Sequence, residues 1–213
     1  MSTMISVLHS PTKTFEYIRE RGGSFVIPLI TLVILALVTV FLQLPIIERA
    51  MDLQKIEGDL AETGVSVDTV KTVGVYIAFI SAPVGVAISA FFMGLLLLLL
   101  NLIVRGEATY MQLVKVALFS LIPGMINGLI SGIMARVTNA DSEQDILFSL
   151  GALMQEKEGF MFGIANIFNP FTLWSLAILI IGASVMCNRP MKTVGLWIGG
   201  IWLVVQLILA TLA

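Results

Sequence analysis

Few residues of this chain have the type and spacing for chemistry, and Lys115 is the first candidate. It lies between two valines in the stretch GEATYMQLVKVALFSLIP, which runs from Gly106 to Pro123. A lysine in an apolar environment can act as a nucleophile or a base when a nearby group tunes its charge. The nearest acid, Glu107, lies two helical turns earlier. We therefore expect the stem of Lys115 to lie along apolar surface while its ammonium group reaches the lipid headgroups.

The other reactive side chains are scarce. The chain has one histidine, His9, and one cysteine, Cys187, which excludes an intramolecular disulfide, most zinc sites and most Ser-His catalytic arrangements. We expect His9 in solvent and Cys187 as a small apolar filler, with lipidation of the thiol as the alternative. Asp141, Glu143 and Asp145 lack the glycine and the terminal glutamate of a calcium loop. No catalytic, cofactor-binding or metal site is therefore predicted.

The composition points to lipid as the solvent of the chain. Of its 213 residues, 58% are hydrophobic and 12% are charged, about half the charged share of ordinary soluble domains. The mean hydropathy is +1.00. The net charge of -2 gives no basic surface for nucleic acid. An integral membrane protein is the class that this balance favours.

Five apolar stretches define the elements that position these residues. They are Phe25–Ile47, Val73–Val104, Leu113–Ala135, Phe171–Cys187 and Val194–Leu212. Each is close to or above the ~20 residues that cross a bilayer as a helix. Helices are expected because backbone groups in lipid must be paired within the segment. The prediction is an all-α, polytopic membrane protein with five spans, in which the long second stretch forms one helix that can tilt or kink at Pro83.

The charges predict an orientation. The first, third and fifth polar segments, counted with Lys115, hold seven cations and three acids, whereas the second and fourth hold five cations and eleven acids. The positive-inside rule then places the N-terminus in the cytoplasm and the C-terminus outside. Residues 1–24 are expected to form a cytoplasmic segment, and residues 25–213 the membrane domain.

The polar segments carry helix signals of their own. Ser10 and Pro11 favour the start of a short amphipathic helix on the membrane surface, which Gly22 ends. Residues 48–64 are typical of a charged helical loop. Ser142 and Asp145 resemble a capping box that opens a helix through Met154. The apolar residues 159–171 are predicted to be interfacial or re-entrant, and the sequence leaves both possibilities open.

Small residues recur at four-residue spacing in three spans, which lets a second helix backbone approach closely. These helix-packing candidates are Ser81, Gly85, Ser89, Gly124, Gly128, Gly132, Gly195 and Gly199. They could form an interface between copies of the chain, or they could pack helices of the same chain together. The second use is the more common one in a five-helix bundle.

The spans hold no Asp or Glu, which argues against a proton relay or an ion-coupled transporter. Asn127 is the best candidate for a buried polar contact. A small transporter or channel would need a polar cavity that is lined by side chains from the set Asn101, Ser120, Asn127 and Gln206.

Three motifs resemble the Yip family, the five-span membrane proteins that interact with Ypt/Rab GTPases, and specifically its bacterial branch. The motif positions are Pro11 and Phe15, then Gly106, Tyr110, Ser120 and Pro123, and finally Asn169, Pro170, Trp174 and Gly182. The resemblance implies a five-helix fold, no enzymatic activity and no cofactor. Eukaryotic members have long cytosolic N-terminal regions, whereas about 24 residues precede the first span here, which favours a bacterial inner-membrane protein over a Rab-binding one.

Similar bacterial proteins are linked with ABC exporters or toxin resistance, which implies an accessory role. The function expected from the sequence is therefore a non-enzymatic scaffold or accessory component. It would act in the lipid bilayer by helix packing with itself or with another membrane protein, such as an ABC exporter. The alternative is a small transporter or channel for an unidentified solute.

Overall fold

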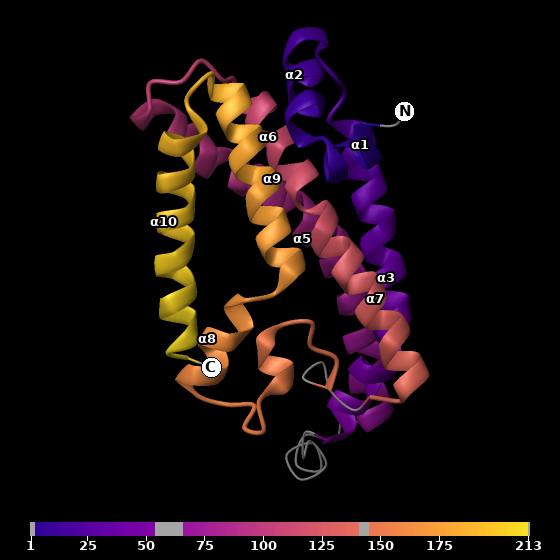
Figure 1. Ribbon diagram of the computed structural model, residues 1–213. Coiled ribbons are helices and arrows are strands. Elements are labelled where there is room, and N and C mark those ends of the chain that lie inside the picture. The colour runs from indigo at the N-terminus through magenta and orange to yellow at the C-terminus, as the bar shows by residue number, and fades with distance from the viewer. Residues whose placement is uncertain (1–2, 54–65, 141–144, 213) are drawn as a thin grey trace.

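The computed structural model describes residues 3–53, 66–140 and 145–212, and these residues are helical with irregular connections (Figure 1). The elements in chain order are α1 (Thr3–His9), α2 (Pro11–Arg21), α3 (Val26–Leu53), α5 (Val67–Ile103), α6 (Tyr110–Ser120), α7 (Ile122–Thr138), the 3-10 helix η2 (Leu150–Leu153), α8 (Phe160–Ile167), α9 (Pro170–Cys187) and α10 (Met191–Ala210).

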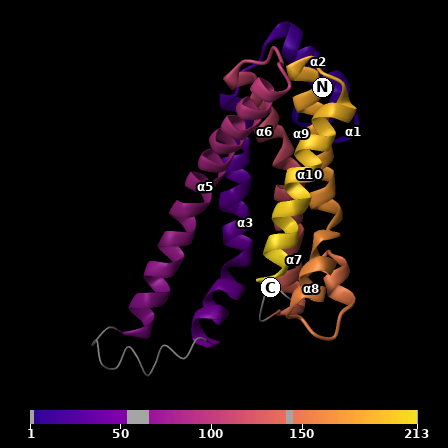
Figure 2. The ribbon, with the colours of Figure 1, turned by 90° about the vertical axis from the view of Figure 1, so that its left-hand side faces the viewer.

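Five helical segments of the described chain are long and apolar enough to cross a membrane, which confirms the predicted fold class. They are α3, α5, α6 together with α7, α9 and α10. The segments run alternately up and down, so the N-terminal helices and the C-terminus lie at opposite ends of the bundle (Figures 1 and 2). We call the end that carries α1 and α2 the N-terminal end.

The second span is a single helix of 37 residues, as predicted, and Pro83 lies inside it. It begins six residues earlier than the apolar pattern, because Ser66 caps it by accepting a hydrogen bond from the Thr69 amide at 3.2 Å. A cap of this kind satisfies one of the free amides of the first turn. The additional turns carry one end of α5 beyond the length that a bilayer requires.

The third span divides into two helices at Leu121, which lies between α6 and α7. Pro123 occupies the first turn of α7, where its missing amide is tolerated. A capping box of Thr109 and Gln112 starts α6. Pro123 therefore lies just after a true helix boundary within the third predicted span.

The helix predicted from Asp145 to Met154 does not form, and this prediction was wrong. The described residues there are irregular except for η2. Ser149 donates a hydrogen bond to Asn166 Oδ1 at 2.5 Å, and a side chain on Gly151 would collide with Asn166 and with Phe162 at 3.0 Å. The segment is folded back on α8, and these contacts outweigh the weak propensity of a ten-residue stretch.

The apolar residues 159–171 contain α8, which has eight residues and is therefore too short to cross a bilayer. Helix α3 continues past Ile47 to Leu53. The remainder of the charged loop, residues 54–65, lies outside the described residues, as do Asp141, Ser142 and Glu143.

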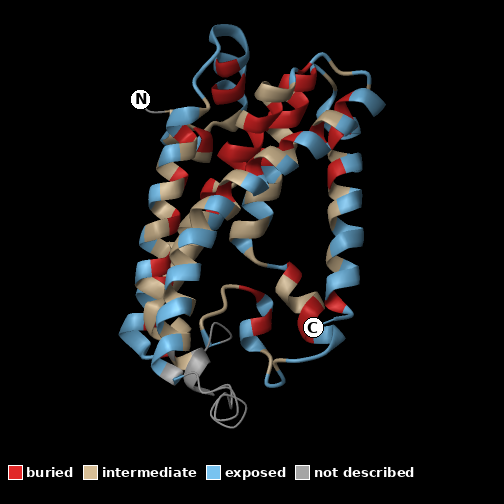
Figure 3. Ribbon diagram, turned by 180° about the vertical axis from the view of Figure 1, so that it is seen from behind, coloured by how far each residue is buried: buried red, intermediate tan, exposed pale blue. Residues whose placement is uncertain are grey.

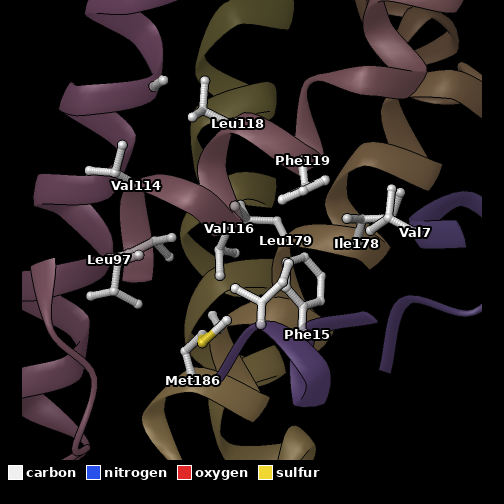
Figure 4. Close-up of a cluster of buried hydrophobic side chains, with 14 of the residues drawn as sticks. Val7, Phe15, Leu97, Val114, Val116, Leu118, Phe119, Ile178, Leu179 and Met186 are labelled. Carbon is white, nitrogen blue, oxygen red and sulfur yellow. The ribbon is translucent and has the colours of Figure 1, made fainter. Parts of the chain in front are cut away.

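The hydrophobic core is concentrated near the N-terminal end (Figure 3). There α2, α6 and α9 meet, with α5 against the other side of α6. The fully buried residues include Phe15, Val116, Leu118 and Ile178 (Figure 4). The apolar side of α2, expected to face lipid, is thus buried against protein. Helices α5 and α10 lie at the edges: α5 packs on α3 and α6, and α10 on α9 and α8.

Candidate functional site

Two motif positions from opposite ends of the sequence meet in the core. Phe15 of α2 has no exposed surface, and its ring packs edge-to-face on Phe119, with 6.0 Å between centroids. A side chain on Gly182 of α9 would lie 2.7 Å from the Phe15 ring and 2.8 Å from Val116. Gly182 therefore provides the notch that receives Phe15, and this pair fixes α2 to the bundle.

The central motif forms a tight turn after α5. Asn101 is buried, and its side chain both accepts from the Ala108 amide and donates to the Ala108 carbonyl, each at 3.2 Å. The Gly106 amide donates to the Asn101 carbonyl at 2.7 Å. A side chain on Gly106 would collide with the Asn101 amide group and lie 2.8 Å from Cys187 Cβ. Glycine is required because the loop passes directly over these groups.

The same turn is bonded to the connection between α9 and α10. The Glu107 amide donates to the Cys187 carbonyl at 3.2 Å, and Asn188 Nδ2 donates to Glu107 Oε2 at 3.2 Å. Arg189 Nε donates to the Arg105 carbonyl at 3.1 Å. Arg19 of α2 extends this network by donating to the Val185 carbonyl at 2.8 Å. We call this group of contacts the N-terminal junction.

The junction has the character of a structural joint. Its arginine side chains donate to backbone carbonyls, and the Glu107 carboxylate accepts from the side chain of Asn188. Lys115 instead lines a separate pocket with Tyr17 and Arg21. Cys187 is fully buried. Among the described residues, the lining of this pocket supplies no acid to Lys115, and the thiol of Cys187 is not accessible.

The remaining motif positions start, end or brace helices. Asn169 caps α9 by accepting from the Phe171 amide at 2.9 Å, and Pro170 follows as its first residue. The Tyr110 hydroxyl donates to the Phe91 carbonyl at 3.0 Å. Ser120 Oγ donates to the Ala117 carbonyl at 2.8 Å. Trp174 is 37% exposed on α9, and Pro11 is the first residue of α2.

The set of small residues on α7 packs this helix against another helix of the same chain. A side chain on Gly128 would lie 3.0 Å from Thr39, and one on Gly132 would lie 2.6 Å from Leu42, so these glycines let α7 approach α3. Gly124 has open space beside it. The structure therefore accounts for two members of this set as packing within the bundle.

The other two sets are largely open. Ser81 and Ser89 are exposed on α5, and no atom lies near the place where a side chain on Gly85 would project. On α10, Gly195 faces Ile180 of α9 at 3.4 Å, whereas Gly199 and Gly200 are open.

An apolar groove of about 430 Å³ follows the open side of α10; we call it the α10 groove. Its lining residues are Leu196, Trp197, Gly200, Ile201, Val204 and Val205.

A small polar cavity of about 160 Å³ lies toward the end of the bundle that is opposite to the N-terminal end. Its polar lining comes from Gln43, Asn127, Ser131 and Asn169. Asn127 Oδ1 is the one buried side-chain oxygen or nitrogen of the described residues that has no hydrogen-bond partner. Of the four polar residues singled out in the sequence, Asn127 is the one that lines this cavity.

Sequence reasoning missed a polar contact between α3 and α7. Pro45 of α3 has no amide, which leaves the Phe41 carbonyl without its helical donor. Arg136 of α7 supplies the replacement: its guanidinium donates to the Phe41 carbonyl, to the Leu42 carbonyl at 3.1 Å, and stacks 4.9 Å from the Phe41 ring centroid. The in-helix proline signals a freed carbonyl, but it does not show which residue bonds to that carbonyl.

Metal ligands do not gather in the part of the chain that the structure describes: no three side chains from His, Cys, Asp and Glu lie together there. Asp145, a member of the acidic run, lies 3.9 Å from Lys157 Nζ. The other two acids of that run lie outside the described residues.

Comparison with known proteins gives two matches. The Yip1 domain model matches residues 5–213. Membrane protein YknW of Bacillus subtilis (strain 168) is 24% identical over 180 residues, which cover 84% of this chain and 76% of that protein. No solved structure matches. Both descriptions concern a membrane protein or domain, and neither names a substrate, a partner or a reaction.

Proposed function

Because this chain belongs to the Yip1 domain family of membrane proteins, we propose that it is a non-enzymatic accessory protein that binds a transmembrane helix of another membrane protein. The α10 groove is the observation that carries this proposal. An ABC exporter is the partner class to test first, as the resemblance implies, and the bacterial inner membrane is the proposed location.

The α10 groove has the features of a helix-docking surface. Helix α10 has the lowest buried share of the five spans. Gly200 forms an open floor between the half-exposed side chains of Trp197 and Val204. In lipid, helices associate by close van der Waals contact, and small residues permit that approach. A partner's ridge of side chains fits such a groove by the ordinary ridges-into-grooves geometry.

Cysteine crosslinking in native membranes tests the proposal. Val204→Cys places a thiol in the groove, and Val38→Cys is the matched control on the lipid-facing side of α3. Both valines are exposed, at 57% and 42%, whereas the native Cys187 is buried and will not compete. We expect the groove variant to form a specific crosslinked product, whose second component mass spectrometry then identifies.

A filled groove should weaken this association. Gly200→Leu places a side chain on the open floor of the groove. When it is combined with Val204→Cys, we expect several-fold less crosslinked product while the protein remains folded. A Val204→Cys yield no higher than that of Val38→Cys would contradict the proposal.

A second function, permeation of a small polar solute, is favoured by the polar cavity alone. The unpartnered Asn127 oxygen can accept a hydrogen bond from a water molecule or from a hydroxyl group of a solute. Reconstituted liposomes whose glycerol permeability exceeds that of protein-free liposomes, and falls on Asn127→Leu, would support it. Equal permeability with and without the protein would dismiss it.

A further inference from the structure

A cationic pocket at the N-terminal end is not used by the junction. It has a volume of about 450 Å³ and lies between α1, α2, the start of α3 and α6. Its polar side includes Tyr17, Arg21 and Lys115, and its apolar side includes Ile18, Ile27 and Phe119. Gly22 and Gly23 leave one edge free of side chains.

The charge of this pocket is uncompensated. Its lining residues include two cations and no acid. Lys115 is half-buried and forms neither a hydrogen bond nor an ion pair with any described residue. The Arg21 guanidinium lies 5.6 Å from the centroid of the Tyr17 ring. The acids of α2, Glu16 and Glu20, are exposed and do not line the pocket. Two cations beside an open pocket favour an anionic ligand.

An apolar track leads away from the pocket along α3. Ile27, a lining residue, is 66% exposed, and Ile30 and Ile34 are 53% and 55% exposed. Spacings of three and four residues place all three side chains on one face of the helix. A ligand with a negatively charged head and an apolar tail would match the pocket and the track together.

We propose that this pocket binds the phosphate-bearing headgroup of an anionic phospholipid, whose acyl chains lie along the isoleucines of α3. Lys115 and Arg21 contact the phosphate, and the Tyr17 hydroxyl is a further donor. A lysine that merely reaches the general headgroup layer would show no preference for one lipid. The two cations that line this pocket produce selectivity for anionic lipid over zwitterionic lipid.

Lipid titration of the purified, delipidated full chain tests the proposal. The probes are phosphatidylglycerol and phosphatidylcholine that carry a fluorophore on one acyl chain. We expect tighter binding of phosphatidylglycerol, weakened roughly fivefold by Lys115→Gln, as removal of one near-surface cation predicts. Lys115→Arg should retain most of the binding. Lys13→Gln removes an exposed cation of α2 outside the pocket and should change nothing.

A second variant and a competition with inorganic phosphate distinguish the possible outcomes. Arg21→Gln should weaken phosphatidylglycerol binding as Lys115→Gln does, and each variant is compared with wild type by circular dichroism to establish that it is folded. Equal affinity for the two lipids, or equal losses in the Lys115→Gln and Lys13→Gln variants, would overturn the proposal. Full displacement of phosphatidylglycerol by excess inorganic phosphate would assign the pocket to free phosphate and overturn the lipid assignment.

Discussion

Gly182 shows how a single missing side chain can position an element. Its hydrogen leaves the space into which the Phe15 ring fits, and Val116 closes the other side. Aromatic rings in an edge-to-face arrangement add packing energy beyond their buried area, which here comes from Phe119. The notch therefore depends on the absence of a methyl group at position 182.

Gly182→Ala is expected to destabilise the protein by about 1–3 kcal/mol, the usual cost of overpacking a filled core. The added Cβ would lie 2.7 Å from the Phe15 ring, so the ring must move. Thermal unfolding in detergent micelles measures the effect. Gly199→Ala is the matched control, because no atom apart from the surrounding backbone of its own helix lies within 4 Å of its added Cβ. Equal unfolding midpoints for the two variants would contradict the notch.

Individual residues were predictable to different extents. Asn127 was the best candidate for a buried polar contact in the third span, but its buried side-chain oxygen has no hydrogen-bond partner among the described residues. Asn101 looked like a polar residue within a span, yet it holds the backbone of Ala108. The bond from Arg136 to the carbonyl freed by Pro45 joins residues 95 positions apart in the sequence. A pattern of local residue types contains no information about such a pairing.

At the scale of elements, long apolar runs were readily predicted because a bilayer sets their length. Proline and glycine marked the bounds of α2 and the break before α7. The connection after α7 was not predictable in the same way. Its capping pattern favours a helix, but Gly151 must approach Asn166 closely, and that contact depends on the position of α8. Tertiary contacts decide where local propensity is weak.

Helix α2 should detach from the bundle when its anchor is removed. Phe15→Ala deletes a fully buried ring, a change that typically costs about 3–5 kcal/mol. We expect faster trypsin cleavage after Lys13, Arg19 and Arg21, because proteolysis requires local unfolding of the helix. Glu16→Ala, an exposed change on the same helix, should cleave at the wild-type rate. Equal cleavage rates in both variants would contradict the anchoring role.

At the scale of the whole molecule, the polarity of the bundle follows from an odd number of spans. The described termini lie at opposite ends of the structure (Figure 1). The cation bias between the polar segments predicts which end faces the cytoplasm. The bundle geometry shows that the ends are opposite, and the assignment of sides remains a prediction.

Thiol labelling of intact cells tests the orientation. Leu212→Cys is expected to react with a membrane-impermeant maleimide, because Leu212 is 78% exposed at the C-terminal end. Lys13→Cys, at an exposed position of α2, should react only after the membrane is broken. The native thiol is buried and gives a low background. If only Lys13→Cys is labelled in intact cells, the orientation is the opposite of the predicted one. Equal labelling of both variants would contradict five spans.

The bond from Arg19 to Val185 also has a consequence for the order in which the protein is made. The two residues are separated by 166 positions, so at ~5–20 residues per second the ribosome needs on the order of ten seconds or more to deliver the second after the first. Throughout that interval α2 lacks the α9 surface that finally covers Phe15. An amphipathic helix that waits beside a bilayer has the lipid surface as its available apolar partner. Helix α2 therefore docks only after the fourth span has been made.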